Sequence, residues 1–143
     1  MEYQLASADI ARALDVLAGD HERIARALAQ VGYPQERRRD HSFATLARII
    51  VGQQVSVAAA TSITRRLVDT LDGDLCADSV LKCPDEDLRG AGLSRQKVSY
   101  MQSLATAEAS GQLSLPSLPE LPDDEAVATI TAIKGFGEWS AHM

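Results

Sequence analysis

The 143-residue chain lacks several features that mark particular classes of protein. It has only two cysteines, Cys76 and Cys83, and no other Cys or His lies near them, so a zinc site lacks its ligands. We interpret both as structural cysteines rather than as a disulfide. No run approaches the roughly 18 apolar residues that a membrane-spanning helix needs, so we expect no membrane partner. The N-terminus has neither the basic region nor the apolar segment of a secretory signal, and we expect a cytoplasmic protein.

Positive charge is also scarce. The sequence has 14 Lys and Arg against 20 Asp and Glu, which gives a net charge of -6. This balance excludes a histone-like protein that binds nucleic acid by bulk charge. It does not exclude a small nucleic-acid footprint, because net charge does not describe any one face. Hydrophobic residues, at 45%, are as frequent as in ordinary globular domains, so disorder of the whole chain is excluded.

The hydrophobic pattern is helical almost throughout, and no segment of strand length alternates between apolar and polar residues. We therefore predict an all-α fold. Tyr33-Pro34 and the polar residues 35–40 form the best candidate for a domain boundary. This boundary separates the helices predicted within residues 1–40 from those predicted within residues 41–143.

Several helix ends can be placed from local signals. Ser42, Ser56 and Ser94 each precede an apolar helical pattern and are predicted N-caps. The three prolines between residues 116 and 122 predict a rigid, extended connector. The acidic residues that follow them, from residue 123, predict the start of another helix.

The segment 133–141, with the sequence IKGFGEWSA, predicts a tight turn between two helices. Gly135 and Gly137 permit backbone dihedrals that other residues avoid, and they allow another backbone to approach closely. Phe136 is expected to pack between the two helices. The free N–H groups at the start of the second helix then form an anion site that suits a DNA phosphate, with Lys134 as a nearby positive charge. The alternative is an ordinary helix–helix turn.

Two further segments carry polar residues of interest. Gln53 and Gln54 lie at a break between two apolar helices, where a projecting glutamine could fill the gap that a flipped nucleotide leaves in a duplex. The alternative is a polar loop in which a glutamine bonds to the backbone. Arg95 and Lys97 follow the predicted cap Ser94 in a first helical turn, where cations oppose the helix dipole and a phosphate would relieve the conflict. The alternative there is a solvated charged face.

In this order the segments resemble the helix–hairpin–helix DNA glycosylase superfamily, and within it the DNA-3-methyladenine glycosylase II branch. The resemblance covers the chain from near residue 40 onward. It is carried by Phe43–Ser56, by Gly92–Tyr100 and by the hairpin segment 133–141. The helix–hairpin–helix motif then lies near residues 123–143. The resemblance also implies that residues 1–40 belong to a second, incomplete helical domain, and that residues 41–143 form the glycosylase domain, which is incomplete at its C-terminus.

The resemblance implies roles for individual residues. The hairpin around Gly135 would hold the phosphate beside the lesion, and the carbonyls of Ile133 and Phe136 would hold a Na⁺ or K⁺ ion. Gln54, with Gln53 beside it, matches the wedge that enters the duplex. Trp139 matches a wall of the pocket for the flipped base, where an indole face suits an electron-poor alkylated purine. The alternative for Trp139 is a core aromatic residue.

The activity implied is base excision repair by monofunctional hydrolysis of the N-glycosidic bond of alkylated purines such as 3-methyladenine and 7-methylguanine. Bifunctional members carry a lysine nucleophile where this chain has Trp139. The partner would be double-stranded DNA that contains alkylated bases, with the protein as a monomer. No cofactor is expected apart from the hairpin cation.

The catalytic aspartate of the family lies after the second hairpin helix, which places it beyond Met143. We therefore expect no catalytic residue in this chain and no activity from the 143-residue chain alone. None of the other acidic residues or histidines considered is expected to replace this aspartate. Asp123, Asp124 and Glu125 suit the dipole of the predicted helix, and Glu138 would lie beside the phosphate and repel it. His21, His41 and His142 have no paired acid or nucleophile.

Two other functions remain open from the sequence. One is a non-catalytic helix–hairpin–helix module that binds DNA. The other is an interaction domain with no role in nucleic-acid binding.

Overall fold

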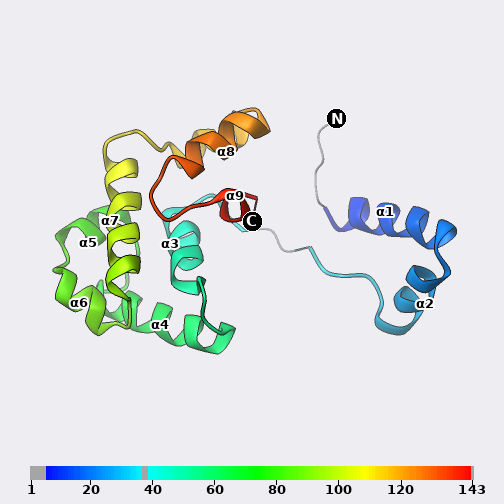
Figure 1. The fold of residues 1–143 in the computed structure, drawn as a ribbon, viewed down its shortest axis with the longest axis horizontal. Coiled ribbons are helices and arrows are strands. Elements are labelled where there is room, and N and C mark those ends of the chain that lie inside the picture. Colours follow the sequence, from blue (N-terminus) through cyan, green and yellow to red (C-terminus); the bar gives the residue numbers. More distant parts are fainter. Residues whose placement is uncertain (1–5, 37–38, 143) are drawn as a thin grey trace. The chain divides into compact units, whose positions relative to one another are not determined.

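The computed structural model describes residues 6–36 and 39–142, and this part of the chain contains helices and no strand, which confirms the predicted all-α class (Figure 1). The contacts divide the chain into two compact units, residues 1–39 and 40–143. The division lies one residue before the boundary expected from the sequence. None of the described helices has the length and apolar character that crossing a membrane requires.

The first unit contains two helices, α1 (Ser7–Asp20) and α2 (Glu22–Val31), which pack against each other. Neither helix contains a fully buried residue. Gly32 ends α2 with a left-handed φ of 72°. The segment after α2 returns to α1, where the Tyr33 hydroxyl donates a hydrogen bond to the Asp15 carboxylate.

The second unit holds the remaining helices. They are α3 (Phe43–Gly52), α4 (Val57–Thr70), α5 (Ala77–Lys82), α6 (Asp85–Gly90), α7 (Arg95–Ala109), the 3₁₀ helix η1 (Leu115–Glu120), α8 (Asp123–Thr131) and α9 (Glu138–Ala141). Helix α7 lies between α3 on one side and α5 and α6 on the other (Figure 1). Its buried residues, among them Met101 and Leu104, meet Ile50 of α3 in one continuous apolar core. Because α7 is central, side chains along its length reach several other elements.

The three predicted serine caps are confirmed. Ser42, Ser56 and Ser94 each accept a hydrogen bond from the backbone N–H three residues later, at 3.2 Å. A cap of this kind typically contributes about 1 kcal/mol.

The prediction of an extended proline connector is wrong. The segment Leu115–Glu120 is a 3₁₀ helix, and both Leu115 and Leu118 are buried. A 3₁₀ helix has 3.0 residues per turn, so leucines three residues apart lie on one face. Burial of that face explains why the prolines do not hold this segment extended.

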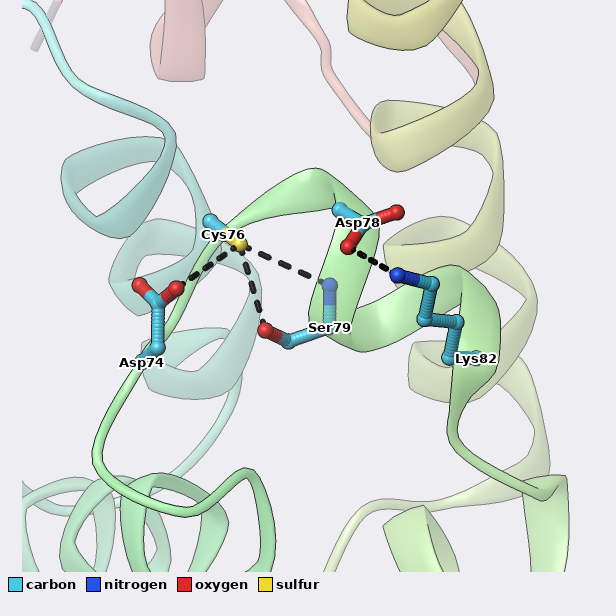
Figure 2. Close-up of polar contacts among 5 residues, drawn as sticks. All are labelled: Asp74, Cys76, Asp78, Ser79 and Lys82. Atoms are coloured by element: carbon cyan, nitrogen blue, oxygen red, sulfur yellow. Dashed lines mark hydrogen bonds and ion pairs between the residues drawn. The ribbon is translucent and has the colours of Figure 1, made fainter.

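The two cysteines lie at the two ends of α5, and both are free. The Cys76 sulfur caps the helix by accepting from the Ser79 N–H at 3.5 Å, and it also lies 3.4 Å from the Asp74 carboxylate (Figure 2). Burial and nearby carboxylates raise the pKa of the Cys83 thiol. Six helical residues separate the pair and span about 9 Å, which is beyond the reach of a disulfide.

Candidate functional site

The predicted hairpin is present between α8 and α9. The Phe136 N–H donates to the Ile133 carbonyl at 3.1 Å, which closes a four-residue turn. Gly135, the third residue of this turn, has φ +101°, in the left-handed region that such turns reserve for glycine. Phe136 is only 6% exposed, so it anchors the turn in the core as expected.

The two hairpin glycines are present for different reasons. A Cβ on Gly135 would lie 2.4 Å from Cγ of Tyr100, which no real contact allows. At Gly137 the φ is -101°, which any residue adopts, and a Cβ there would meet no described atom within 4 Å. The expectation of an unusual backbone dihedral is therefore right for Gly135 and wrong for Gly137. The space beside Gly137 is open in the described part of the chain.

The start of α9 is open. Gly137 is its N-cap, and no side chain caps it among the described residues. The first hydrogen bond of the helix runs from the Ala141 N–H to the Gly137 carbonyl at 3.1 Å. The N–H groups of the first turn are therefore not used by the helix itself. Glu138 is exposed in this turn.

The two glutamines between α3 and α4 differ in environment. The Gln53 amide donates to the Gly135 carbonyl at 2.8 Å, so the backbone-bonding alternative applies to this residue. Gln54 is exposed and has φ +56°, which is uncommon for a residue other than glycine. The wedge remains a prediction, and Gln54 is the residue placed to act as one.

A hollow of about 490 Å³ brings the hairpin and the glutamines together. It is lined by residues from the segment between α3 and α4, from α7, from the hairpin turn and from α9, namely Gln53, Gln54, Tyr100, Gly135, Phe136, Gly137, Trp139 and Ser140. Trp139 is 72% exposed, so it is not a core aromatic residue in the described chain. An exposed indole at the edge of a hollow offers a flat apolar surface to a ring-shaped ligand.

The phosphate contacts predicted at the start of α7, by Ser94, Arg95 and Lys97, remain predictions. Ser94 acts as the N-cap, and the Lys97 ammonium donates to the Val51 carbonyl in the last turn of α3 at 2.7 Å. Burial lowers the pKa of Lys97. A cation at the C-terminus of a helix is favoured by the helix dipole, so this contact also fastens α7 to α3.

Lys134 and Arg95 belong to a separate groove of about 590 Å³ along α7 and the end of α8. The Lys134 ammonium donates to the Ser99 hydroxyl of α7 at 2.9 Å, and neither residue is among those described as lining the hollow. Lys134 therefore ties the hairpin to α7, and its predicted phosphate contact remains a prediction.

Acidic residues are absent from the described lining of the hollow. The acidic residues Asp123, Asp124 and Glu125 occupy the first turn of α8, where they suit the helix dipole. No cluster of three metal-ligating side chains is found in the described part of the chain.

The two carbonyl groups predicted to bind a cation at the hairpin can be checked for lone pairs that no hydrogen bond uses. The Ile133 carbonyl already accepts the turn hydrogen bond from Phe136, which leaves it one lone pair. The Phe136 carbonyl accepts no backbone hydrogen bond in the turns and loops of the described chain. Both groups therefore retain capacity for a monovalent ion, whereas the Gly135 carbonyl between them is taken by Gln53.

Tyr100 is a site residue that the sequence reasoning missed, although it ends one of the recognised segments. Its ring packs against Gly135, and its hydroxyl accepts a hydrogen bond from the Gln96 amide. The only signal in the sequence was the glycine itself, because a turn glycine can indicate that another residue approaches closely.

Comparison with known proteins decides the family. Residues 47–136 match the family described as HhH-GPD superfamily base excision DNA repair protein. The chain belongs to this superfamily. The match includes both glutamines and the hairpin turn as far as Phe136.

Individual members of the superfamily are similar over most of the chain. DNA-3-methyladenine glycosylase of Saccharomyces cerevisiae is 33% identical over 112 residues, which cover 71% of this chain and 37% of the yeast protein. The DNA-3-methyladenine glycosidase of Bacillus halodurans superposes with a TM-score of 0.74 at 29% identity, over 87% of this chain and 58% of that protein. The Schizosaccharomyces pombe 3-methyladenine DNA glycosylase, solved in complex with abasic DNA, superposes with a TM-score of 0.81 at 26% identity, over 91% of this chain and 66% of that chain.

The chain thus spans less than two thirds of the length of each of these relatives.

Proposed function

We propose that this chain supplies the DNA-binding part of a base excision DNA glycosylase of the 3-methyladenine type. The observation that supports this most is the hollow in which an exposed indole, an exposed strained glutamine and an open helix start lie together. A similar protein from Schizosaccharomyces pombe was solved with abasic DNA. DNA is therefore the partner that we propose.

Each part of the hollow has a role in this proposal. The N–H groups at the start of α9 bind a phosphate next to the flipped nucleotide, because backbone donors need no side-chain charge. Beside the hollow, the carbonyls of Ile133 and Phe136 would hold a monovalent cation, which would supply positive charge close to the same phosphate. Gln54 fills the space that the flipped base vacates, and Trp139 stacks on the base itself.

The proposed reaction is hydrolysis of the bond between an alkylated purine and its sugar. As this bond breaks, positive charge develops on the sugar, and a carboxylate stabilises it and assists water. No acidic residue and no lysine lines the hollow among the described residues. The resemblance puts Trp139 where bifunctional members carry their lysine nucleophile, and this supports the proposal of a monofunctional enzyme that forms no Schiff base with the sugar.

Binding to duplex DNA that lacks one base in its base stack tests the proposal. A labelled duplex with one abasic site and the same duplex without it are titrated with the 143-residue protein, and the two dissociation constants are compared. We expect tighter binding of the abasic duplex. Trp139 is the single tryptophan of the chain, so its fluorescence reports directly on the hollow. Equal affinity for both duplexes together with unchanged tryptophan fluorescence would overturn the proposal.

The second candidate function is a module that binds DNA without cleaving it. No carboxylate is among the described residues that line the hollow, and this favours the non-catalytic module for the 143-residue chain by itself. Binding without release of methylated bases from alkylated DNA is expected of the 143-residue chain under both candidates. Measurable release by the pure chain would exclude the non-catalytic module.

A further inference from the structure

We propose that Gln53 is a positioning residue that fixes Gln54 relative to the hairpin, and that this coupling creates selectivity for DNA with a vacant position in the stack. The inference rests on the proposed function and deepens it. It gives Gln53 a different task from the wedge role expected from the sequence.

The Gln53 bond completes the support of one peptide group in the turn. The N–H of the peptide between Gly135 and Phe136 donates to the Ile133 carbonyl at 3.1 Å. Its carbonyl accepts from the Gln53 amide at 2.8 Å. Both polar ends of this peptide are therefore held, and the next residue, Gly137, begins the open start of α9.

The same side chain determines where Gln54 lies. Gln54 follows Gln53 directly in the chain, so a hydrogen bond to the hairpin from one residue limits how far the other can move. Gln54 also has a left-handed φ of 56°, a conformation that is unfavourable for a residue with a Cβ and persists only where the surroundings enforce it. The bond from Gln53 is one such constraint.

Helix α7 supports both partners from behind. Lys97 donates to the Val51 carbonyl, two residues before Gln53, at 2.7 Å. The ring of Tyr100 lies against Gly135. Residues three apart share one face of a helix, so a single face of α7 contacts both the end of α3 and the hairpin. The hydrogen bond from Gln53 adds a direct contact between the segment after α3 and the hairpin.

Substitution by methionine tests the inference. Gln53→Met keeps the length of the side chain and removes the donor. Gln102→Met is the matched control, because Gln102 is also half-buried and donates through its amide, but to Asp85 and away from the hollow. The measured quantity is the ratio of the dissociation constants for intact and abasic duplexes. This ratio does not depend on the folded fraction, since partial unfolding weakens both affinities equally.

We expect Gln53→Met to lower the ratio about five- to tenfold, the value of one hydrogen bond, and Gln102→Met to leave it unchanged. Gln54→Ala should also lower the ratio, and adding Gln53→Met to it should cause no further loss, because one residue acts through the other. Independent, additive losses would overturn the inference.

The outcomes distinguish this inference from the proposed function. If Gln54→Ala lowers the ratio and Gln53→Met does not, Gln53 has only a structural role and the proposed function stands. If the unmodified chain does not prefer the abasic duplex, the proposed function fails and the inference fails with it.

Discussion

Alanine at Gly135 should destabilise the protein severely, and the structure gives the size of the effect. The new Cβ would lie 2.4, 2.6 and 2.8 Å from Cγ, Cδ2 and Cβ of Tyr100. These atoms belong to the stiff base of a ring that packs against the core, so the backbone must move instead. Such overpacking costs about 1–3 kcal/mol, and φ +101° adds about 1–2 kcal/mol for a residue with a Cβ. We expect a total loss of about 2–5 kcal/mol.

Alanine at Gly137 should behave in the opposite way. Its φ of -101° is ordinary and its Cβ would meet no described atom within 4 Å, so the free energy of unfolding should change by less than about 1 kcal/mol. If a phosphate approaches the start of α9, however, the added methyl group lies in its path. Gly137→Ala should therefore weaken binding to duplex DNA while the fold stays intact.

The pair is measured by urea unfolding and by titration of labelled duplex DNA. A loss of DNA binding in Gly135→Ala alone is ambiguous, because the fold is damaged as well. Gly137→Ala carries the functional test. Unfolding of Gly135→Ala at the same urea concentration as the unmodified chain would refute the packing argument. Unchanged DNA affinity in Gly137→Ala would refute the close approach of a phosphate.

Three further predictions concern the backbone of Gln54, the Lys97 contact and the ionisation of Asp40. Gln54→Gly should be more stable to urea than Gln54→Ala by about 1 kcal/mol, because only glycine relieves the left-handed φ, and an equal stability would show that no strain is stored there. Lys97→Met should lower the free energy of unfolding by about 1 kcal/mol, since the Val51 carbonyl at the end of α3 loses its cationic partner, and an unchanged or raised value would contradict this. Hydrogen bonds from Thr45 and Ser42 hold the pKa of Asp40 below its ordinary 3.8. The ionised Asp40 therefore stabilises the folded protein at pH values above 3.8, and this contribution is lost as the pH falls through the lowered pKa. Asp40→Asn should therefore lose stability at neutral pH and show a weaker acid dependence in urea unfolding, and an acid dependence equal to that of the unmodified chain would exclude the assignment.

The parts of the fold that could be predicted are those set by neighbours in the sequence. Ser42, Ser56 and Ser94 act on N–H groups three residues away, and the helical periodicity is equally local. The hairpin turn is predictable for the same reason, since its glycines and its apolar Phe136 are adjacent. The failure at Leu115–Glu120 arises because the local preference of proline does not include the core that receives Leu115 and Leu118.

The parts of the site that could not be predicted depend on residues far apart in the chain. Gln53 and Gly135 are 82 positions apart, and Lys97 and Val51 are 46 apart. No periodicity or cap signal relates such pairs. A lysine in the first turn of a helix therefore suggests a phosphate ligand, whereas the fold places the C-terminus of another helix beside it.

These long-range contacts also bear on how an acidic chain could hold DNA. Lys97 and Lys134, the two lysines nearest the hollow along the recognised segments, are both engaged with protein atoms, at Val51 and at Ser99. Their charges serve to fasten α3 and the hairpin to α7. The described lining of the hollow that this fixes consists of backbone groups and of glutamine, tyrosine, phenylalanine, tryptophan and serine side chains, none of which is charged. Such a surface can distinguish DNA by its shape and by the loss of a stacked base, and it gains little from bulk attraction to phosphates. In the proposed complex with DNA, the lysines would contribute to recognition by fixing the position of uncharged groups, which is compatible with a net charge of -6.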